Sequence, residues 1–315
     1  MHYHRRKGWE IPASETTPEA IFLDRRGFLA GAGAIAAGVA LARPAFAEDA
    51  DSTASLYPAK HNDAFTLDRE VTPEKINLNY NNFYEFSTNK HLSADTLKTR
   101  PWTVKIDGLV EKEQILGIDD LIKSIGLEER LYRHRCVEAW SMAIPWTGFP
   151  LRALVEKAKP LASAKYVRFE TFLDKKMAPG QKSFMPWPYI EGLTMAEATN
   201  DLAFMVTGAY GKPVAKVQGA PLRLALPWKY GFKSAKSIVK ISFVDKRPET
   251  FWQTLGPEEY GFWANVNPDV AHPRWSQAKE TELTTGNLRP TMIYNGYGAE
   301  VADLYKGLDK EPLFM

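Results

Sequence analysis

The segment RHRCVEAWSM, residues 133–142, contains the only cysteine in this chain of 315 residues. Cationic neighbours favour the thiolate form of a cysteine, and Cys136 is flanked by Arg133, His134 and Arg135. A soft thiolate is a good ligand for a soft metal. Zinc and iron–sulfur sites, however, use several Cys or His ligands at short spacings, and this chain has one Cys and six His. The segment therefore favours a cofactor that brings most of its own metal ligands and takes a single thiolate from Cys136.

Other interpretations of this segment stay open at the level of sequence. A lone cysteine is most often buried and inert. A nucleophile of the cysteine-protease kind needs a histidine base, and His134 would share a strand face with Cys136. In an extended strand Glu138 would also share that face, where it could shuttle protons or control an open metal position. Otherwise Glu138 forms an ion pair with Arg133 or Arg135.

Two further segments combine polar groups with aromatic residues. The first is YNNFYEF, residues 80–86, in which amides and aromatic rings alternate. The second is APLRLALPWKYGFKSAKSI, residues 220–238, which places four cations around a glycine. These cations are Arg223, Lys229, Lys233 and Lys236. Backbone N–H groups and ammonium groups in such a loop can hold a phosphate, and a solvated basic surface is the alternative.

Hydrophobic periodicity predicts strands separated by short helices. The expected strands are residues 102–108, 166–172, 202–207 and 237–244. The expected helices begin at Asp119 and Pro150, and a shorter one covers residues 195–199. Strands and helices do not alternate regularly, and no glycine-rich phosphate motif follows a strand. The pattern predicts an α+β fold with mixed sheets and short helices.

Residues 1–47 have the organisation of a twin-arginine export signal. Arg25 and Arg26 precede the uncharged stretch 28–42, and Ala45-Phe46-Ala47 is a small-x-small cleavage site. The uncharged stretch has 15 residues, fewer than the roughly 20 that span a bilayer, so we expect cleavage rather than a membrane anchor. The twin-arginine pathway exports folded proteins, often after they have taken up a cofactor.

After this signal we expect a periplasmic protein of one compact domain. Residues 48–75 are predicted to form an extended N-terminal arm, and residues 76–315 the catalytic domain. The chain has 40 basic and 38 acidic residues, a balance that gives no reason to expect nucleic acid as a partner. Nine Trp, sixteen Phe and thirteen Tyr indicate a core or pocket rich in aromatic rings.

Together, the three segments resemble those of the catalytic subunits of bacterial periplasmic protein-methionine-sulfoxide reductases, which have a sulfite-oxidase-like molybdopterin-binding fold. The resemblance implies that Cys136 is the protein's thiolate ligand to molybdenum and that Glu138 is catalytic. It implies one molybdopterin in its mononucleotide form. The residues implied to contact the cofactor are Asn81, Tyr84, Glu85, Cys136, Thr171, Gln218, Arg223, Ser234, Ala235 and Lys236. Gln218 stands where some relatives have asparagine, and its longer amide can still donate and accept hydrogen bonds.

The same resemblance implies the reaction, the reduction of methionine sulfoxide in oxidised periplasmic proteins. The sequence has no Cys-x-x-Cys-His haem motif and no flavin fingerprint, so electrons must come from another protein. The resemblance implies a membrane-bound haem b subunit fed by the quinone pool, and the twin-arginine translocase as the export partner.

Two alternative functions remain. A sulfite-oxidase-like enzyme would run the opposite chemistry, but residues 48–315 leave little room for the dimerisation domain of such oxidases. A non-enzymatic periplasmic binding protein would carry Cys136 as an inert thiol.

Overall fold

A hairpin of two long strands carries the cysteine segment and organises the larger of two sheets. In the computed structural model, which describes residues 51–314, strand β4 (Glu128–Arg135) pairs antiparallel with β5 (Trp140–Pro150). Nearly every residue of β5 is buried, because this strand has partners on both sides. The turn that contains Cys136 therefore leads directly into β5, a buried strand in the interior of the sheet.

The larger sheet has eight strands within the described part of the chain. Beyond β4, β5 pairs antiparallel with β8 (Phe204–Ala209) and parallel with β12 (Lys279–Glu282). The remaining strands are β1 (Lys60–His61) beside β4, β9 (Lys212–Pro213) and β10 (Arg223–Ala225) beside β8, and β13 (Leu288–Pro290) beside β12.

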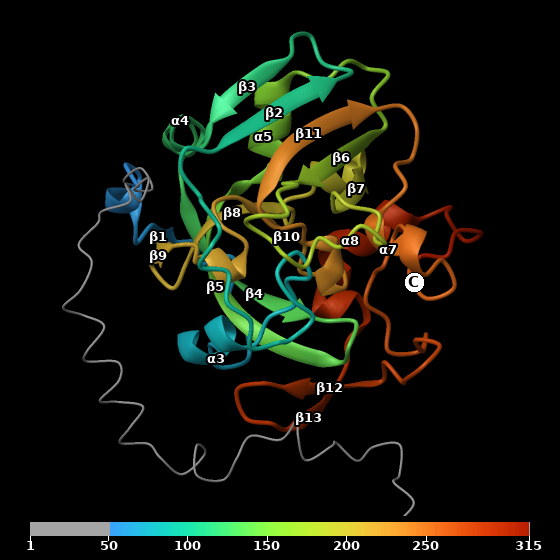
Figure 1. The fold of residues 1–315 in the computed structure, drawn as a ribbon. Helices are drawn as coiled ribbons and strands as arrows, with labels where there is room; N and C mark the ends of the chain where they lie inside the picture. Colours follow the sequence, from blue (N-terminus) through green and yellow to red (C-terminus); the bar gives the residue numbers. More distant parts are fainter. Residues whose placement is uncertain (1–50, 315) are drawn as a thin grey trace, which may run out of the picture. The chain divides into compact units, whose positions relative to one another are not determined.

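The second sheet has five strands in the order β3-β2-β11-β6-β7 among residues 51–314. Figure 1 shows it in the upper part of the view, with β4, β12 and β13 in the lower part. Its strands are β2 (Thr103–Gly108), β3 (Gln114–Gly117), β6 (Tyr166–Thr171), β7 (Ile190–Thr194) and β11 (Ile238–Val244). β2 and β11 run parallel and the other neighbours antiparallel. Both sheets are thus mixed, which confirms the predicted α+β class.

The α-helices of the described residues are short and lie between the strands. They are α3 (Glu74–Asn79), α4 (Ile118–Ser124), α5 (Leu151–Ala158), α6 (Met195–Ala198), α7 (Phe251–Leu255) and α8 (Gly298–Val301). Single 3₁₀ turns are η3 (Ala54–Leu56), η4 (Lys216–Gln218), η5 (Gly231–Lys233), η6 (Ile293–Gly296) and η7 (Ala302–Tyr305). No α-helix of the described region is long and apolar enough to cross a membrane.

The predicted helices α4, α5 and α6 and the predicted strands β2, β6 and β11 are confirmed. Strand β8 begins at Phe204 rather than at Leu202. The reason is a turn at Asn200, whose side-chain oxygen accepts a hydrogen bond from Leu202 N–H while its carbonyl accepts one from Ala203 N–H. Because of these bonds, Leu202 and Ala203 do not join the hydrogen-bond ladder of β8.

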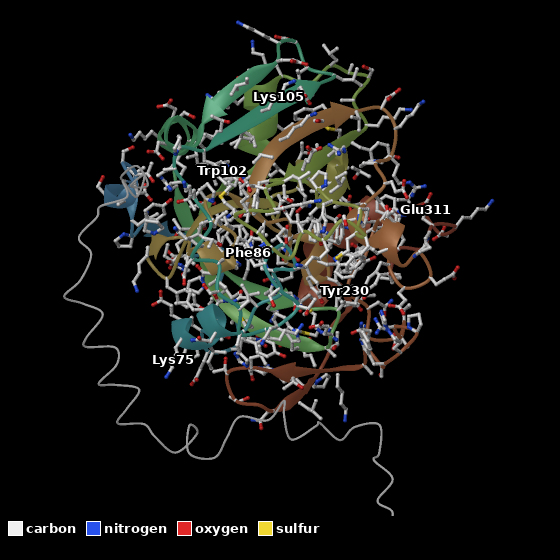
Figure 2. All side chains as sticks on the ribbon, in the orientation of Figure 1. Lys75, Phe86, Trp102, Lys105, Tyr230 and Glu311 are labelled. Carbon is white, nitrogen blue, oxygen red and sulfur yellow. The ribbon has the colours of Figure 1, made fainter. Side chains whose placement is uncertain are left out.

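The apolar core is rich in aromatic residues and draws on both sheets. Phe149 of β5 and Phe169 of β6 are fully buried in the same connected cluster. Figure 2 shows Phe86 within the molecule, whereas Lys75 and Lys105 lie at its edge. This matches the aromatic core expected from composition.

The predicted arm is held against the domain along residues 51–75. The Tyr57 hydroxyl donates to Thr207 Oγ1 at 2.8 Å, and Thr72 N–H donates to the Ala143 carbonyl at 2.9 Å. Asp51 forms an ion pair with Arg100 at 2.8 Å. The predicted export signal, residues 1–47, lies outside the described residues.

Candidate active site

Three segments that are far apart in the sequence meet at a cavity of about 490 Å³. They are the loop after α3, the β4–β5 hairpin and the connection from β10 to β11. The predicted site residues that line the cavity are Asn81, Tyr84, Glu85, Cys136, Glu138, Arg223, Ser234, Ala235 and Lys236.

Cys136 lies at the turn between β4 and β5, not within an extended strand. The turn comprises residues 136–139, and Ala139 has a positive φ of 62°. Cys136 N–H donates to the Trp140 carbonyl at 2.9 Å, and Ala139 N–H donates to the Cys136 carbonyl at 3.0 Å. The expectation that an extended strand aligns Cys136 and Glu138 is therefore wrong. The turn nevertheless brings Glu138 Oε2 to 3.8 Å from the Cys136 sulfur.

The positive charge of Arg135 lowers the pKa of the Cys136 thiol, but burial outweighs this effect. Arg133 pairs with Asp68 at 2.7 Å and Arg135 pairs with Glu280 at 2.9 Å. Alternation along β4 turns both side chains away from the cavity face. Burial raises the pKa of the Cys136 thiol to about 12, and the neighbouring Glu138 carboxylate adds to the rise. The prediction that the flanking cations make the thiolate the favoured form is wrong, so a thiolate here requires positive charge from a bound group.

His134 lines the cavity on the same strand face but is not paired with the cysteine. The Cys136 sulfur instead contacts Asn82 Nδ2 at 3.5 Å and Glu138 N–H at 3.4 Å. Burial, with Arg223 adding to it, lowers the pKa of His134 to about 3, so the ring is neutral. A nucleophile activated by histidine requires direct contact between the two groups, which this arrangement lacks.

Three donors hold the Glu138 carboxylate. Its Oε2 accepts hydrogen bonds from Trp140 Nε1 at 3.0 Å and from Asn82 Nδ2 at 3.1 Å, and Lys90 forms an ion pair with it. Burial opposes ionisation, but these donors outweigh it and lower the pKa of Glu138. The partner is thus Lys90, not Arg133 or Arg135 as the sequence alternative proposed. Asn82 falls within the YNNFYEF segment, whereas Lys90 has no distinguishing pattern around it in the sequence.

The loop after α3 places polar groups on the cavity and an aromatic ring in the core. Asn81 Nδ2 donates to the Asn77 carbonyl at 2.7 Å and so satisfies the end of α3. Burial raises the pKa of Glu85 to about 7 and also raises that of Tyr84. Phe83, which lies between Asn81 and Tyr84 in the sequence, is fully buried. The alternation in the sequence therefore separates cavity side chains from a core anchor.

Thr171 and Gln218 lie behind the cavity rather than in its lining. The Thr171 hydroxyl donates to Glu85 Oε1 at 3.4 Å. Gln218 Nε2 donates to Asn77 Oδ1 at 2.6 Å, and Asn77 is a lining residue. Both predicted residues thus reach the cavity through a neighbour.

The four cations of segment 220–238 divide into two pairs. Lys229 is buried against Glu197 at 2.6 Å, and Lys233 against Glu191 at 2.5 Å. Arg223 and Lys236 line the cavity instead. The segment is therefore neither a solvated basic surface nor a cluster of four ligand-facing cations.

Arg223 and Lys236 favour an anionic ligand. Arg223 donates to the backbone carbonyls of Gln218 and Leu224 at 2.6 and 3.1 Å, and Lys236 donates to the Asn82 carbonyl. Neither forms an ion pair with a carboxylate in the described structure. Burial lowers the pKa of Arg223 to about 9, and burial and Arg223 lower that of Lys236 to about 7. A bound phosphate would compensate both cations.

A molybdopterin fits these residues. The cavity combines a buried thiol with two cations that form no close ion pair with a carboxylate among residues 51–314. Within residues 51–314, no group of three or more His, Cys, Asp or Glu side chains could hold a metal ion. A metal at Cys136 would therefore take its other ligands from a cofactor.

Aromatic rings that sequence analysis did not single out form another side of the cavity. Trp252 contacts Tyr84 with ring centroids 5.1 Å apart and Tyr260 with centroids 4.9 Å apart, and Phe232 contacts Tyr260 at 5.4 Å. We call Trp252, Tyr260 and Phe232 the aromatic wall. Arg274 also lines the cavity and lies 4.8 Å above the ring of Trp275. Only the aromatic content of the sequence hinted at this wall.

Comparisons with known proteins agree with this site. A family model described as "Oxidoreductase molybdopterin binding domain" matches residues 91–252. The protein-methionine-sulfoxide reductase catalytic subunit MsrP of Pseudomonas syringae pv. tomato is 49% identical over 319 residues, covering 94% of this chain and 95% of that protein. MsrP of Burkholderia mallei is 48% identical over 320 residues, covering 98% and 96%.

Among solved structures, the sulfane dehydrogenase SoxCD from Paracoccus pantotrophus has a TM-score of 0.47 and 16% identity, covering 88% of this chain and 67% of that one. The MsrP relatives match at about one half identity over nearly their whole length. The chain therefore belongs to the MsrP family of molybdopterin-dependent protein-methionine-sulfoxide reductase catalytic subunits, and it contains a molybdopterin-binding oxidoreductase domain.

Proposed function

We propose that this chain reduces methionine sulfoxide in oxidised periplasmic proteins to methionine. The reaction takes two electrons and two protons and yields a thioether and water. The bound molybdenum cofactor supplies the oxygen-atom transfer and redox chemistry, and the protein supplies binding, orientation and protons. The observation that carries the proposal is that one cavity is lined by the Cys136 thiol, the Glu138 carboxylate and the aromatic wall.

For the cofactor, we assign Cys136 as the protein ligand to molybdenum. Arg223 and Lys236, with the Ser234–Ala235 backbone beside them, would hold the phosphate of a single pterin in its mononucleotide form. The pterin itself would contact Asn81, Tyr84 and Glu85, which line the same cavity. Thr171 and Gln218 would act from behind by fixing Glu85 and Asn77.

For the substrate, the aromatic wall suits a methionine sulfoxide side chain. Aromatic rings make favourable contacts with the flexible, polarizable side chain of methionine. A sulfoxide oxygen is a strong hydrogen-bond acceptor, and Arg274 provides guanidinium donors beside Trp275. Glu259 holds Arg274 at 2.8 Å and so orients it. This pairing of apolar wall and donor favours a neutral, dipolar substrate.

For proton delivery, Glu138 is placed between solvent and the metal ligand. Its side chain is 29% exposed, and its Oε2 lies 3.8 Å from the Cys136 sulfur. Lys90, Asn82 and Trp140 keep the carboxylate in that position. As a carboxylate between solvent and the metal ligand, Glu138 could relay toward the cofactor the two protons that the released water requires.

For partners and location, the proposal includes a membrane-bound haem b subunit that delivers electrons from quinones. Residues 1–47 would direct export through the twin-arginine translocase, so that the enzyme works in the periplasm. The leader's paired arginines and cleavage motif support this route. Protein substrates would be the oxidised proteins of that compartment.

The first test is metal analysis of protein made in a host that synthesises molybdopterin. Stoichiometric molybdenum and reduction of peptide methionine sulfoxide are expected, with little oxidation of sulfite in a parallel assay. Protein without molybdenum would contradict the cofactor assignment. Sulfite turnover without sulfoxide reduction would favour an oxidase.

Cys136→Ser tests the ligand assignment. The serine hydroxyl is a harder and less acidic ligand than a thiolate, so activity should fall to background and molybdenum retention should decrease. The measurement is molybdenum per chain together with methionine sulfoxide turnover. Wild-type turnover in Cys136→Ser would exclude Cys136 as the ligand.

A further inference from the structure

The turn that carries Cys136 is held on its backbone carbonyls by a segment more than a hundred residues away in the sequence. The Val137 carbonyl accepts hydrogen bonds from Gln277 Nε2 and from Trp275 Nε1, each at 2.8 Å. The Ala139 carbonyl accepts one from Thr281 N–H at 2.8 Å. Segment 275–281 thus contacts the turn directly.

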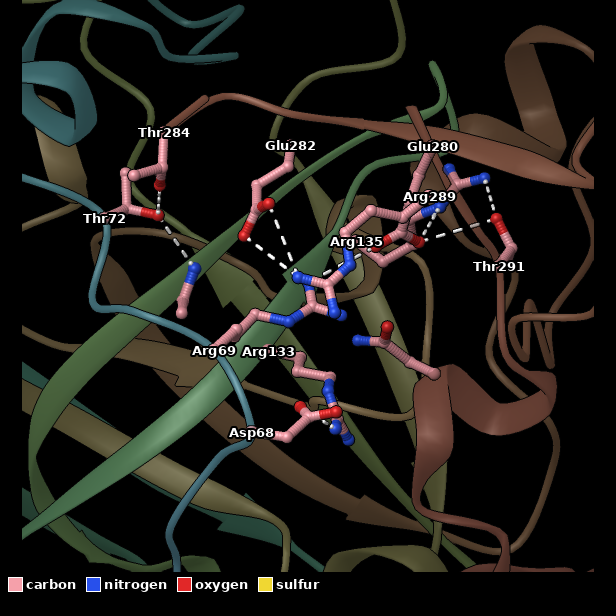
Figure 3. A network of polar contacts seen from close by, with 12 residues as sticks. Asp68, Arg69, Thr72, Arg133, Arg135, Glu280, Glu282, Thr284, Arg289 and Thr291 are labelled. Carbon is pink, nitrogen blue, oxygen red and sulfur yellow. Dashed lines mark hydrogen bonds and ion pairs between the residues drawn. The ribbon is translucent and has the colours of Figure 1, made fainter. Parts of the chain in front are cut away.

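The Cys136 carbonyl has its own charged donor, Arg135. Arg135 Nη1 donates to that carbonyl, and Arg135 is fully buried. Its Nη2 donates to Gln277 Oε1 at 2.8 Å and to Thr291 Oγ1 at 3.2 Å. Its Nε pairs with Glu280 at 2.9 Å, and Figure 3 shows Arg135, Glu280 and Thr291 within one polar network.

Gln277 is the link between these two sets of contacts. Its amide oxygen accepts from Arg135 while its amide nitrogen donates to the Val137 carbonyl. Only 1% of Gln277 is exposed, so water cannot easily replace either bond. One side chain therefore fixes Arg135 and the turn relative to each other.

The network also reaches the N-terminal arm. Arg69 pairs with Glu280 at 3.4 Å, and both side chains are 2% exposed. Figure 3 shows Arg69 in the same polar network as Arg135 and Glu280. The turn is consequently attached to chain segments from both ends of the domain.

We propose that Arg135 and Gln277 form a positioning clamp that sets the location of the Cys136 sulfur toward the metal. The clamp does not touch the metal and acts through the backbone of residues 136–139. It rests on the proposed function only in taking Cys136 as the ligand. Groups that orient a metal ligand from outside the coordination shell affect metal affinity or activity by about 10–100-fold.

The test is Gln277→Met, which keeps the size of the side chain and removes both amide contacts. We expect the protein to fold and bind molybdenum, to show a shifted molybdenum EPR signal, and to lose about 10-fold in kcat. KM for methionine sulfoxide should stay unchanged, because Gln277 is not part of the cavity lining.

Gln181→Met is the matched control. Gln181 is also 1% exposed, and its amide also makes two buried hydrogen bonds, donating to the Phe172 carbonyl at 2.8 Å and accepting from Asp174 N–H at 2.9 Å. It does not contact the Cys136 turn. The two variants should lose similar thermal stability, and only Gln277→Met should change the EPR signal and kcat.

Wild-type EPR signal and kcat in Gln277→Met would overturn the clamp, as would equal changes in Gln181→Met. If Gln277→Met fails to take up molybdenum, Thr291→Val carries the test, because it removes one acceptor of Arg135 at the far end of the network. A smaller shift of the same signals is then expected, and unchanged signals would overturn the clamp. Failure of the ligand assignment itself would be separate, since it appears as an unchanged EPR signal in Cys136→Ser.

Discussion

Lys229 and Lys233 differ from Arg223 and Lys236 in their ion-pair partners, although all four cations come from residues 220–238. The first two are buried in ion pairs with Glu197 and Glu191. The second two line the cavity and form no ion pair with a carboxylate in the described structure. Cations of one segment thus serve two different purposes, one in ion pairs of the core and one at the cavity.

The difference teaches how to recognise a ligand-facing cation. A buried cation with an acidic partner contributes to the folded protein by itself, whereas one without such a partner is compensated only when an anion binds. The pKa of Lys236 is lowered to about 7 by burial and by Arg223, which together outweigh the opposing effect of Glu85. For Lys229, burial lowers the pKa only to about 8, because Glu197 opposes the effect.

The largest expected effect comes from breaking a paired cation. Lys229→Met leaves the Glu197 carboxylate buried without its cation, which should lower the free energy of unfolding by about 3–5 kcal/mol. Denaturant titration measures this. The double variant Lys229→Met with Glu197→Gln should recover most of the loss, because no uncompensated charge remains. A double variant as unstable as the single one would contradict the ion-pair interpretation.

At Arg223 we expect a smaller effect, and it concerns cofactor retention rather than the free energy of unfolding. Arg223→Met should weaken cofactor retention by about 1.5–3 kcal/mol, the range for hydrogen bonds to charged groups, while the cofactor-free protein loses little stability. The measurement is molybdenum and pterin content after dialysis, with unfolding of the cofactor-free protein beside it. Full cofactor content with a large loss of stability would place Arg223 among the structural cations and break the comparison.

The smallest expected effect is a pH dependence in protein prepared without cofactor. Lys236 has a folded pKa of about 7 against an ordinary value of 10.5, so the folded state binds fewer protons between these values. Its stability should therefore rise as pH increases from about 7, with a gradient of at most about 1.4 kcal/mol per pH unit. Lys236→Met should flatten the curve between pH 7 and 8. Lys240→Met, which alters a partly exposed lysine paired with Asp107 at 3.3 Å, should keep the wild-type curve.

Sequence patterns predicted the α+β class and nine of the residues that line the cavity, but not the contacts among them. Glu138 lies beside Cys136 as expected, yet through a turn rather than a strand. Asn82 belongs to a segment that the sequence singles out, whereas Lys90 does not. A local pattern reports alternation and spacing, and it carries no information about a lysine that approaches from a separate loop.

The sequence by itself determined that Cys136 is the sole thiol, that its setting resembles a molybdopterin enzyme and that residues 1–47 resemble an export signal. Only the tertiary structure decided which cations face the cavity, which rings form the aromatic wall and which groups hold the Cys136 turn. The physical reason is that charge pairing and burial depend on segments distant along the chain. Arg135, for example, is adjacent to Cys136 in the sequence. Its guanidinium group nevertheless pairs with Glu280 of β12 instead of facing the Cys136 sulfur.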